Sequence, residues 1–231
     1  MLEFYVDNEY RDKVRVFKDR LHAGRILGSM LESLGWNLSC IVAVPSGGVP
    51  VALACSSILR LKVYVCPVRK ILFPWTTEAG FGAVSYLGVE VYDRAAADWI
   101  GRKEFRKALE AALESVNGRV KLYSKFLVPN NPGDVVIVDD GLATGFTMLA
   151  AVKTARMLNA RSITVAVPTA SESAVQMLRE NVDRMAILNL RGGYTYAVAD
   201  AYTMWRDIPE EEALRMLKET VEANNTLVRD L

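Results

Sequence analysis

Two adjacent aspartates, Asp139 and Asp140, end a short apolar run and open a loop of small residues. The run and loop read VVIVDDGLATGFT over 135–147. Paired carboxylates repel an anion, but they accept hydrogen bonds from vicinal hydroxyls and offer hard oxygen ligands to Mg²⁺. Glycines and the outward-pointing N–H groups of a helix start favour an anion such as phosphate. The stretch therefore indicates a site for a phosphorylated sugar.

The elements on either side of the loop determine where this site lies. The apolar, β-branched run 135–138 is typical of a strand buried on both faces of a parallel sheet. Apolar residues recur at helical spacing after the loop, and Asn159 is a plausible left-handed stop. Ligands of open α/β sheets bind beyond the carboxyl ends of strands, so the loop 139–147 is placed for binding. The alternative is a polar turn in which the aspartates act as turn formers or a helix cap.

The loop lacks the GK[ST] of a Walker A motif and the glycine spacing of a dinucleotide fingerprint. It resembles the motif of the type I phosphoribosyltransferases that binds PRPP, a ribose 5-phosphate carrying pyrophosphate at C1. The resemblance implies that Asp139 and Asp140 bind the ribose hydroxyls and hold Mg²⁺, directly or through PRPP and water. It also implies that the following loop binds the 5-phosphate through Gly141, Leu142, Ala143, Thr144, Gly145, Phe146 and Thr147.

A second glycine loop follows a predicted buried strand and reads PSGGVP over 45–50. A loop at this point binds pyrophosphate in type I phosphoribosyltransferases. The resemblance is closer still to a branch of predicted phosphoribosyltransferases whose loop commonly reads RGGVP. Here Ser46 stands in place of the arginine, which removes a guanidinium and leaves Ser46, Gly47 and Gly48 as the implied pyrophosphate-binding residues. A plain glycine turn before a helix is the alternative.

Two cations, Arg69 and Lys70, close a strand predicted over 62–68. The family has a basic pair in this position, and the resemblance implies that it binds the diphosphate. A mobile loop that covers the site follows the pair in the family, and 71–82 is the matching segment. Its Glu78 lies in a stretch that resembles the E-x-x-x-GAV of the branch, which implies a place near the acceptor.

The C-terminal third contains aromatic residues that can stack on a planar acceptor. The segment resembles the Y-A-V-x-x-x-Y stretch of the branch, so the likeness covers nearly the whole chain. The family implies a hood, here about 190–231 with the N-terminus, that selects the acceptor base. The candidate stacking residues are Tyr194, Tyr196, Tyr202 and Trp205, of which Tyr202 and Trp205 join Glu78 as implied acceptor residues. Packing of the last helix against the sheet is the alternative for at least half of these rings.

Alternating strands and helices over 231 residues predict one α/β domain, 1–231, with a central, mostly parallel sheet flanked by helices. The expected strands are 39–44, 62–68, 135–138, 162–167 and 184–190, with a hairpin over 83–91. The expected helices are 12–34 with Gly35 at its end, 51–59, 93–115, 169–179 with a capping box over 169–172, and one after Pro209.

Composition limits the classes of partner and of chemistry. A net charge of +1 gives no reason to expect nucleic acid or an anionic membrane. No apolar window is long enough to span a bilayer and the start lacks a signal-peptide core, so we expect a cytoplasmic protein. Cys40, Cys55 and Cys66 lie in apolar runs without metal-site spacing. The single histidine, His22, lies in a predicted helix, which argues against Ser-His or Cys-His catalysis.

The resemblance implies a phosphoribosyltransferase that uses PRPP and Mg²⁺ to transfer ribose 5-phosphate to a nitrogenous acceptor, a nucleobase or related heterocycle, and releases pyrophosphate. Asp139, Asp140, Arg69 and Lys70 are the implied catalytic residues. The partners are small molecules, and a homodimer or higher homo-oligomer is expected. The alternative, left open by Ser46, is a non-catalytic regulatory protein of the same fold that binds PRPP or a nucleotide.

Overall fold

A six-stranded parallel sheet forms the centre of the protein, which a computed structural model describes over residues 2–193 and 196–229, with side chains to 223. Its strands are β1 (Glu3–Val6), β2 (Cys40–Ala43), β3 (Val63–Val65), β7 (Asp134–Val138), β8 (Ser162–Ser171) and β9 (Arg184–Arg191). They lie in the order β1-β9-β8-β7-β2-β3, and every neighbouring pair is parallel. The chain proceeds from β2 to β3 on one side and from β7 to β8 and β9 on the other. The point between β2 and β7 is therefore a topological switch point, where such sheets bind ligands.

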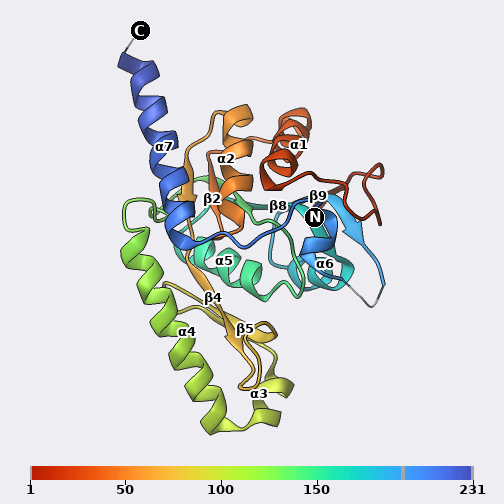
Figure 1. Ribbon diagram of the computed structural model, residues 1–231, viewed down its shortest axis with the longest axis vertical. Coiled ribbons are helices and arrows are strands. Elements are labelled where there is room, and N and C mark those ends of the chain that lie inside the picture. Colours follow the sequence, from red (N-terminus) through yellow and green to blue (C-terminus); the bar gives the residue numbers. More distant parts are fainter. Residues whose placement is uncertain (1, 194–195, 230–231) are drawn as a thin grey trace.

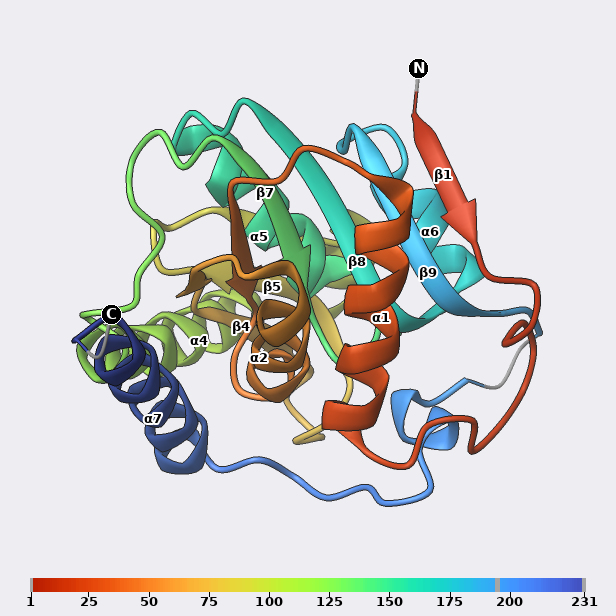
Figure 2. The ribbon, with the colours of Figure 1, turned by 90° about the horizontal axis from the view of Figure 1, so that it is seen from above.

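Helices cover both faces of this sheet (Figure 1, Figure 2). Residues of β7 alternate between the two cores: Val135 and Ile137 pack on one side, and Val136 and Val138 on the other. This alternation explains why the predicted strand is apolar throughout, because neither side chain direction meets water. One face carries α1 (Arg20–Leu34), α2 (Gly48–Leu59) and α7 (Glu210–Arg229), and the other carries α5 (Phe146–Met157) and α6 (Glu172–Leu178).

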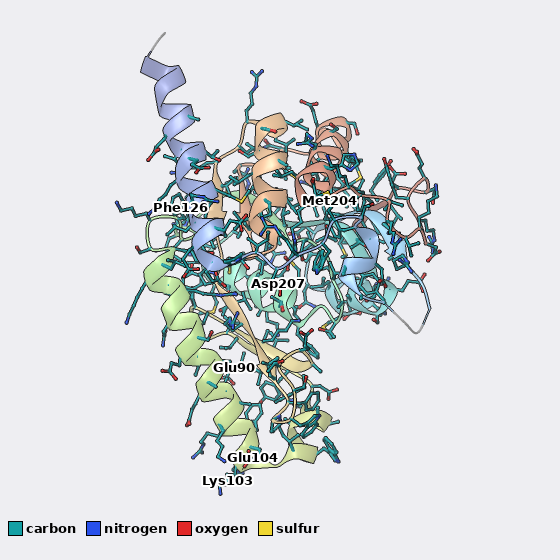
Figure 3. All side chains as sticks on the ribbon, in the orientation of Figure 1. Glu90, Lys103, Glu104, Phe126, Met204 and Asp207 are labelled. Carbon is teal, nitrogen blue, oxygen red and sulfur yellow. The ribbon has the colours of Figure 1, made fainter. Side chains whose placement is uncertain are left out.

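A separate antiparallel sheet and two helices form an arm, defined here as residues 68–122. Figure 1 shows the arm projecting from the central sheet, and Glu104 and Lys103 mark its far end in Figure 3. Ile71, Phe81 and Val84 form its core with side chains of the two helices. Its elements are β4 (Val68–Leu72), β5 (Gly80–Ser85), β6 (Glu90–Tyr92), α3 (Arg94–Ile100) and α4 (Arg102–Leu122).

The predicted helix 12–34 is wrong in its first turns. The helix begins at Arg20, because the Asp19 carboxylate accepts the His22 N–H at 2.8 Å and caps it. The preceding residues form turns and bends, with left-handed backbone at Asp12 and Arg15, and they pair with the C-terminal region: Phe17 N donates to Ala201 O at 3.0 Å. Apolar periodicity does not distinguish the two conformations, because the Phe17 side chain is expected to be buried in the predicted helix and is buried in the observed segment.

The predicted strand 62–68 is also wrong, because it is two strands in two sheets. β3 ends at Val65 and β4 begins at Val68. Arg69 and Lys70 therefore lie inside β4 of the arm and do not close a strand of the central sheet. β4 and β5 take up both ends of the predicted loop 71–82 and leave only the connection 73–79.

Two helix predictions need further correction. The predicted helix 93–115 breaks at Gly101, whose φ of 83° interrupts the helical backbone between α3 and α4, and α4 then continues to Leu122. The predicted capping box over 169–172 is absent: β8 continues to Ser171, whose hydroxyl caps α6 by accepting Ala174 N–H at 3.1 Å.

Two predicted left-handed helix ends are confirmed. Gly35 ends α1 with a φ of 63°, and Asn159 follows α5 with a φ of 61°. All three cysteines are buried and free. Within the described part of the chain, each helix is too short or too polar to cross a lipid bilayer.

Candidate functional site

The loop after β7 is held against the end of β8 by main-chain and hydroxyl contacts. Leu142 N donates to Thr169 O at 2.9 Å, and Ser171 N donates to Leu142 O at 2.9 Å. The Ser171 hydroxyl also donates to Ala143 O at 2.6 Å. The carbonyls of Leu142 and Ala143 are thus both bonded to Ser171, and residues Ala143 and Thr144 are exposed.

The start of α5 is open to an anion. Gly145 precedes the helix with a φ of 85°, a conformation that favours glycine, and no side chain caps the helix. The first N–H groups of a helix have no intrahelical acceptor and carry partial positive charge. Thr147, half-buried in the first turn, adds a hydroxyl. A helix start of this kind suits a phosphate group, and the role of residues 142–147 in binding one stays a prediction.

The glycine loop after β2 lies directly against the two aspartates. A Cβ on Gly47 would stand 2.1 Å from Asp140 Oδ2, and one on Gly48 would stand 2.8 Å from Val138 O. Only glycine allows so close an approach at these two positions. The Pro45–Ser46 peptide bond in this loop is cis. The structure thus brings together the two loops that the sequence singled out, at the switch point of the sheet.

The two aspartates differ in their surroundings. Asp140 Oδ2 forms an ion pair with Arg20 Nε at 2.8 Å. Burial, and then the adjacent charge of Asp140, raise the pKa of Asp139 well above its usual range, although the Asp140 N–H donates to Asp139 Oδ1 at 2.8 Å. The protein by itself therefore disfavours the charged form of Asp139, which a cation or a pair of hydroxyls would stabilise.

The donor set fits Mg²⁺ only in part. Asp139 and Asp140 offer hard carboxylate oxygens of the kind that Mg²⁺ takes. Within the described residues no group of three or more His, Cys, Asp or Glu side chains is arranged to hold a metal. An ion bound here would therefore complete its coordination with substrate oxygens and water.

Arg20, which the sequence analysis missed, connects this site to the C-terminal region. Its side chain is 8% exposed, Nη1 donates to Arg206 O at 2.8 Å, and Cζ stands 3.8 Å from the centre of the Trp205 ring. Tyr202 completes the cluster, because its hydroxyl donates to Asp140 O at 2.6 Å. No motif surrounds Arg20, and the only signal in the sequence is the capping Asp19 before it.

The two predicted acceptor aromatics lie beside the aspartates, but in different states. Tyr202 is only 3% exposed, whereas Trp205 is 37% exposed. Trp205 and Arg20 line a cavity of about 370 Å³ between the start of α1 and the segment leading into α7. Asp207, labelled in Figure 3, marks that segment. The other lining residues are Asp19, Leu21, Pro50, Met204, Arg206, Ile208, Glu212 and Met216.

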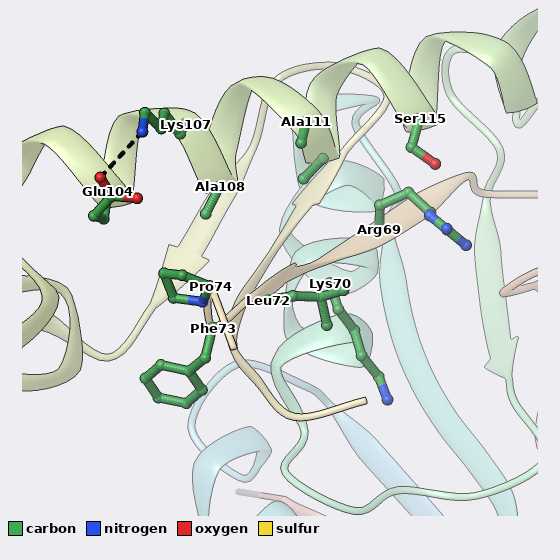
Figure 4. Close-up of a pocket in the computed structure, with 11 residues that line it drawn as sticks. Arg69, Lys70, Leu72, Phe73, Pro74, Glu104, Lys107, Ala108, Ala111 and Ser115 are labelled. Carbon is green, nitrogen blue, oxygen red and sulfur yellow. Dashed lines mark hydrogen bonds and ion pairs between the residues drawn. The ribbon is translucent and has the colours of Figure 1, made fainter. Parts of the chain in front are cut away.

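Arg69 and Lys70 line a different cavity of about 310 Å³ between β4 and α4 (Figure 4). Figure 4 shows the two side chains leaving the strand in different directions, with the Lys70 ammonium pointing away from α4. Within the described chain neither has an ion-pair partner. The Arg69 charge contributes to lowering the pKa of Arg119, after the larger effect of burial, and Arg119 contacts Pro45 O at 2.9 Å. Arg69 therefore lies near the glycine loop.

Of the other predicted acceptor residues, Glu78 lies apart from this cluster. Glu78 is exposed in the connection 73–79, and its N–H donates locally to Thr76 Oγ1 at 3.1 Å. The structure does not bring it into contact with the aspartates. The Tyr196 hydroxyl donates to Thr169 Oγ1 at 3.2 Å, and Tyr194 lies outside the described residues.

The parallel sheet, its switch point and the paired loops define an α/β protein with a candidate site at the carboxyl ends of β2 and β7. The chain is 30% identical over 214 residues to two curated Mycobacterium tuberculosis proteins, from strains H37Rv and CDC 1551, each named "Putative phosphoribosyl transferase". The match covers 88% of this chain and 47% of each relative, so the chain spans about half their length. No protein-family model matches the chain.

A solved structure, that of TT1426 from Thermus thermophilus, is 30% identical to this chain with a TM-score of 0.70. The likeness covers 88% of this chain and 98% of that protein, so it extends over the whole of the shared fold. Over 88% of its length the chain is therefore similar to proteins named as phosphoribosyltransferases, and it shares the fold of TT1426.

Proposed function

We propose that the protein transfers ribose 5-phosphate from PRPP to a nitrogenous acceptor and releases pyrophosphate. One observation carries the proposal: a glycine loop, an acidic pair and an uncapped helix start converge at the switch point of the sheet. The three features suit the diphosphate, the ribose hydroxyls and the 5-phosphate, in that order. The family relationship supports the reaction class.

The chain's own residues supply positioning and charge. The N–H groups at the start of α5 hold the 5-phosphate, and Asp139 and Asp140 accept hydrogen bonds from the ribose hydroxyls. As the C1–oxygen bond breaks, positive charge develops on the ring and negative charge on the leaving diphosphate. The carboxylates balance the positive charge on the ring. Arg69 and Lys70, together with the glycine loop, balance the negative charge on the diphosphate. Mg²⁺, when bound, neutralises diphosphate charge and orients its oxygens.

The acceptor site belongs to the same proposal. Trp205 has the more exposed ring of the two predicted aromatics and borders a cavity beside Arg20, which supports stacking of a planar heterocycle there. Tyr202 is buried and acts indirectly, because its hydroxyl holds the main-chain carbonyl of Asp140 by a hydrogen bond. Glu78 serves the acceptor only when the connection 73–79 moves toward the site.

A PRPP-binding regulatory protein is the second candidate, and the glycine loop supports it. Ser46, which stands where the branch commonly has arginine, donates its hydroxyl to Ile208 O at 2.6 Å. The loop then offers the diphosphate only main-chain donors. The unpaired Arg69 and Lys70 favour the enzyme, because a sensor has less need of cations for a leaving group.

The experiment that separates these functions uses labelled PRPP, Mg²⁺ and a panel of purine, pyrimidine and pyridine acceptors. We expect pyrophosphate release with one acceptor class. Binding of PRPP without release on any acceptor would favour the sensor, and the absence of PRPP binding would contradict both.

The cellular setting completes the proposal. Three free, buried cysteines fit a reducing compartment such as the cytoplasm. Trp75 and Trp99, which are 62% and 73% exposed on the arm, are candidates for a contact between copies in a homo-oligomer. Light scattering after size exclusion of the wild type and of Trp99→Ala tests the second point, and a monomeric wild type would contradict it.

A further inference from the structure

We propose that Arg119 positions the diphosphate side of the site and that Glu210 is its partner in this role. The inference rests on the proposed function. Arg119 lies in the last turn of α4, at the base of the arm, and its side chain is 11% exposed. Its guanidinium joins three segments that are far apart in the sequence: the glycine loop, β4 and the start of α7.

Two of its contacts are to main-chain carbonyls beside the predicted diphosphate-binding residues. Arg119 Nη1 donates to Pro45 O at 2.9 Å and to Val68 O at 2.7 Å. The first carbonyl belongs to the peptide whose N–H is that of Ser46, and the second to the peptide whose N–H is that of Arg69. One guanidinium group therefore fixes the orientation of both peptide units. The rigid geometry of arginine suits this double contact better than a lysine ammonium does.

The remaining contacts balance the charge and involve the last helix. Arg119 Nη2 forms an ion pair with Glu210, the first residue of α7, and the Tyr123 hydroxyl donates to Glu210 Oε2 at 2.8 Å. Burial lowers the pKa of Arg119, and the charge of Glu210 opposes that effect. The Ser46 hydroxyl bond to Ile208 O ties the same two segments together a second time.

These contacts assign Arg119 an indirect role. Both of its terminal nitrogens are engaged by protein acceptors, so it has little left to offer a substrate. Arg119 acts through Pro45 and Arg69. When its side chain is shortened, the glycine loop and strand β4 lose the guanidinium that binds both. Diphosphate affinity should then fall more than the turnover of bound substrate.

Arg119→Lys and Glu210→Gln test this role, with Arg161→Met as the matched control. Arg161 pairs with Asp134 at the amino end of β7, opposite the carboxyl end that carries the site, so the control also removes a charged contact but leaves the site intact. We expect calorimetry with Mg²⁺ and pyrophosphate to give a dissociation constant about tenfold higher for Arg119→Lys and about threefold higher for Glu210→Gln. KM for PRPP should rise in parallel, with kcat within about threefold of wild type. Arg161→Met should bind as wild type does.

Wild-type affinity in both test variants would overturn the proposal, as would an equal weakening in Arg161→Met. If Arg119→Lys does not fold, the shift in Glu210→Gln decides alone. Hydrogen exchange of the ligand-free proteins separates this inference from the proposed function. Amides 46–49 should exchange about tenfold faster in Arg119→Lys or Glu210→Gln than in wild type, whether or not the protein binds PRPP. Unchanged exchange there would remove the anchoring role, whereas a wild type that binds neither ligand would contradict the proposed function alone.

Discussion

Strand β7 has an aspartate at each end, and the two are in opposite electrostatic states. At the amino end, the hydrogen bond from Arg161, with a smaller contribution from Ser162, lowers the pKa of Asp134 to about 2 in spite of burial. At the carboxyl end, burial and the neighbouring charge of Asp140 raise the pKa of Asp139 well above its usual range. One strand thus places the same side chain in a satisfied and in an unsatisfied environment.

The difference separates a structural carboxylate from a functional one. Asp134 accepts bonds from Arg161 Nε at 2.9 Å and from the Ser162 hydroxyl at 2.7 Å. At the other end, Arg20 forms its ion pair with Asp140, and the hydrogen-bond partner of Asp139 is Asp140, through its main-chain N–H at 2.8 Å and its side chain. An uncompensated buried carboxylate costs stability, and such groups cluster where a ligand supplies the missing partner.

Replacing Asp139 with Asn gives the largest expected effect. The amide retains the bond from Asp140 N–H but loses the charge for the ribose hydroxyls and Mg²⁺, so we expect about 100-fold weaker binding of Mg²⁺–PRPP by calorimetry. Asp139→Asn with Asp140→Asn should abolish binding. At pH 7 the single variant should melt at or above the wild-type temperature, because a neutral amide does not carry the cost of a carboxyl whose pKa is raised by folding. Undiminished binding by the double variant would reject the site assignment.

Gly47→Ala tests whether the glycine loop and the carboxyl end of β7 form one site. The new methyl group would stand 2.1 Å from Asp140 Oδ2, so the carboxylate must move away from Arg20. We expect about tenfold weaker binding of Mg²⁺–PRPP. Gly118→Ala, on exposed α4 with no atom within 4 Å of the new Cβ, is the matched control and should stabilise by about 0.5–1 kcal/mol without changing affinity. Equal affinities in the two variants would separate the loop from the site.

Local patterns in the sequence predicted one half of this site well. The strand, acidic pair and loop over 135–147 are contiguous, so composition, periodicity and family resemblance all act on one short segment. The same holds for Gly35 and Asn159, whose left-handed backbone is a property of a single residue and its neighbours. These features needed no knowledge of the tertiary fold.

The other half depends on contacts between distant segments. Arg20, Arg119 and Glu210 match no motif, and each acquires its role only when α1, α4 and α7 meet at the switch point. The split of the predicted strand 62–68 arises in the same way. A run of apolar residues does not indicate which sheet each of its parts will join. Because 62–68 was predicted as one strand, Arg69 was wrongly placed at the end of a strand of the central sheet.

Asp134→Asn tests the amino end of the comparison. The amide keeps an acceptor for Ser162 but loses the charged contact with Arg161, which is largely exposed and partly screened. We expect a free energy of unfolding about 1–2 kcal/mol lower than that of wild type at pH 7, measured by urea denaturation. Affinity for Mg²⁺–PRPP should be unchanged. Weakened binding with a wild-type unfolding free energy would reverse the roles assigned to the two ends.

The difference in unfolding free energy between wild type and Asp134→Asn should depend on pH, which is the smallest expected effect and the most specific one. A carboxyl whose pKa is lower in the folded than in the unfolded chain contributes stability above its unfolded pKa of about 3.9 and loses it as the pH falls. For Asp134 the contribution should fade between about pH 4 and its folded pKa of about 2. Urea midpoints of wild type and Asp134→Asn should therefore converge as the pH falls from 4 to 2. A constant gap across that range would mean that Asp134 stabilises the protein through its shape and hydrogen bonds rather than its charge, and the contrast with Asp139 would then no longer be electrostatic.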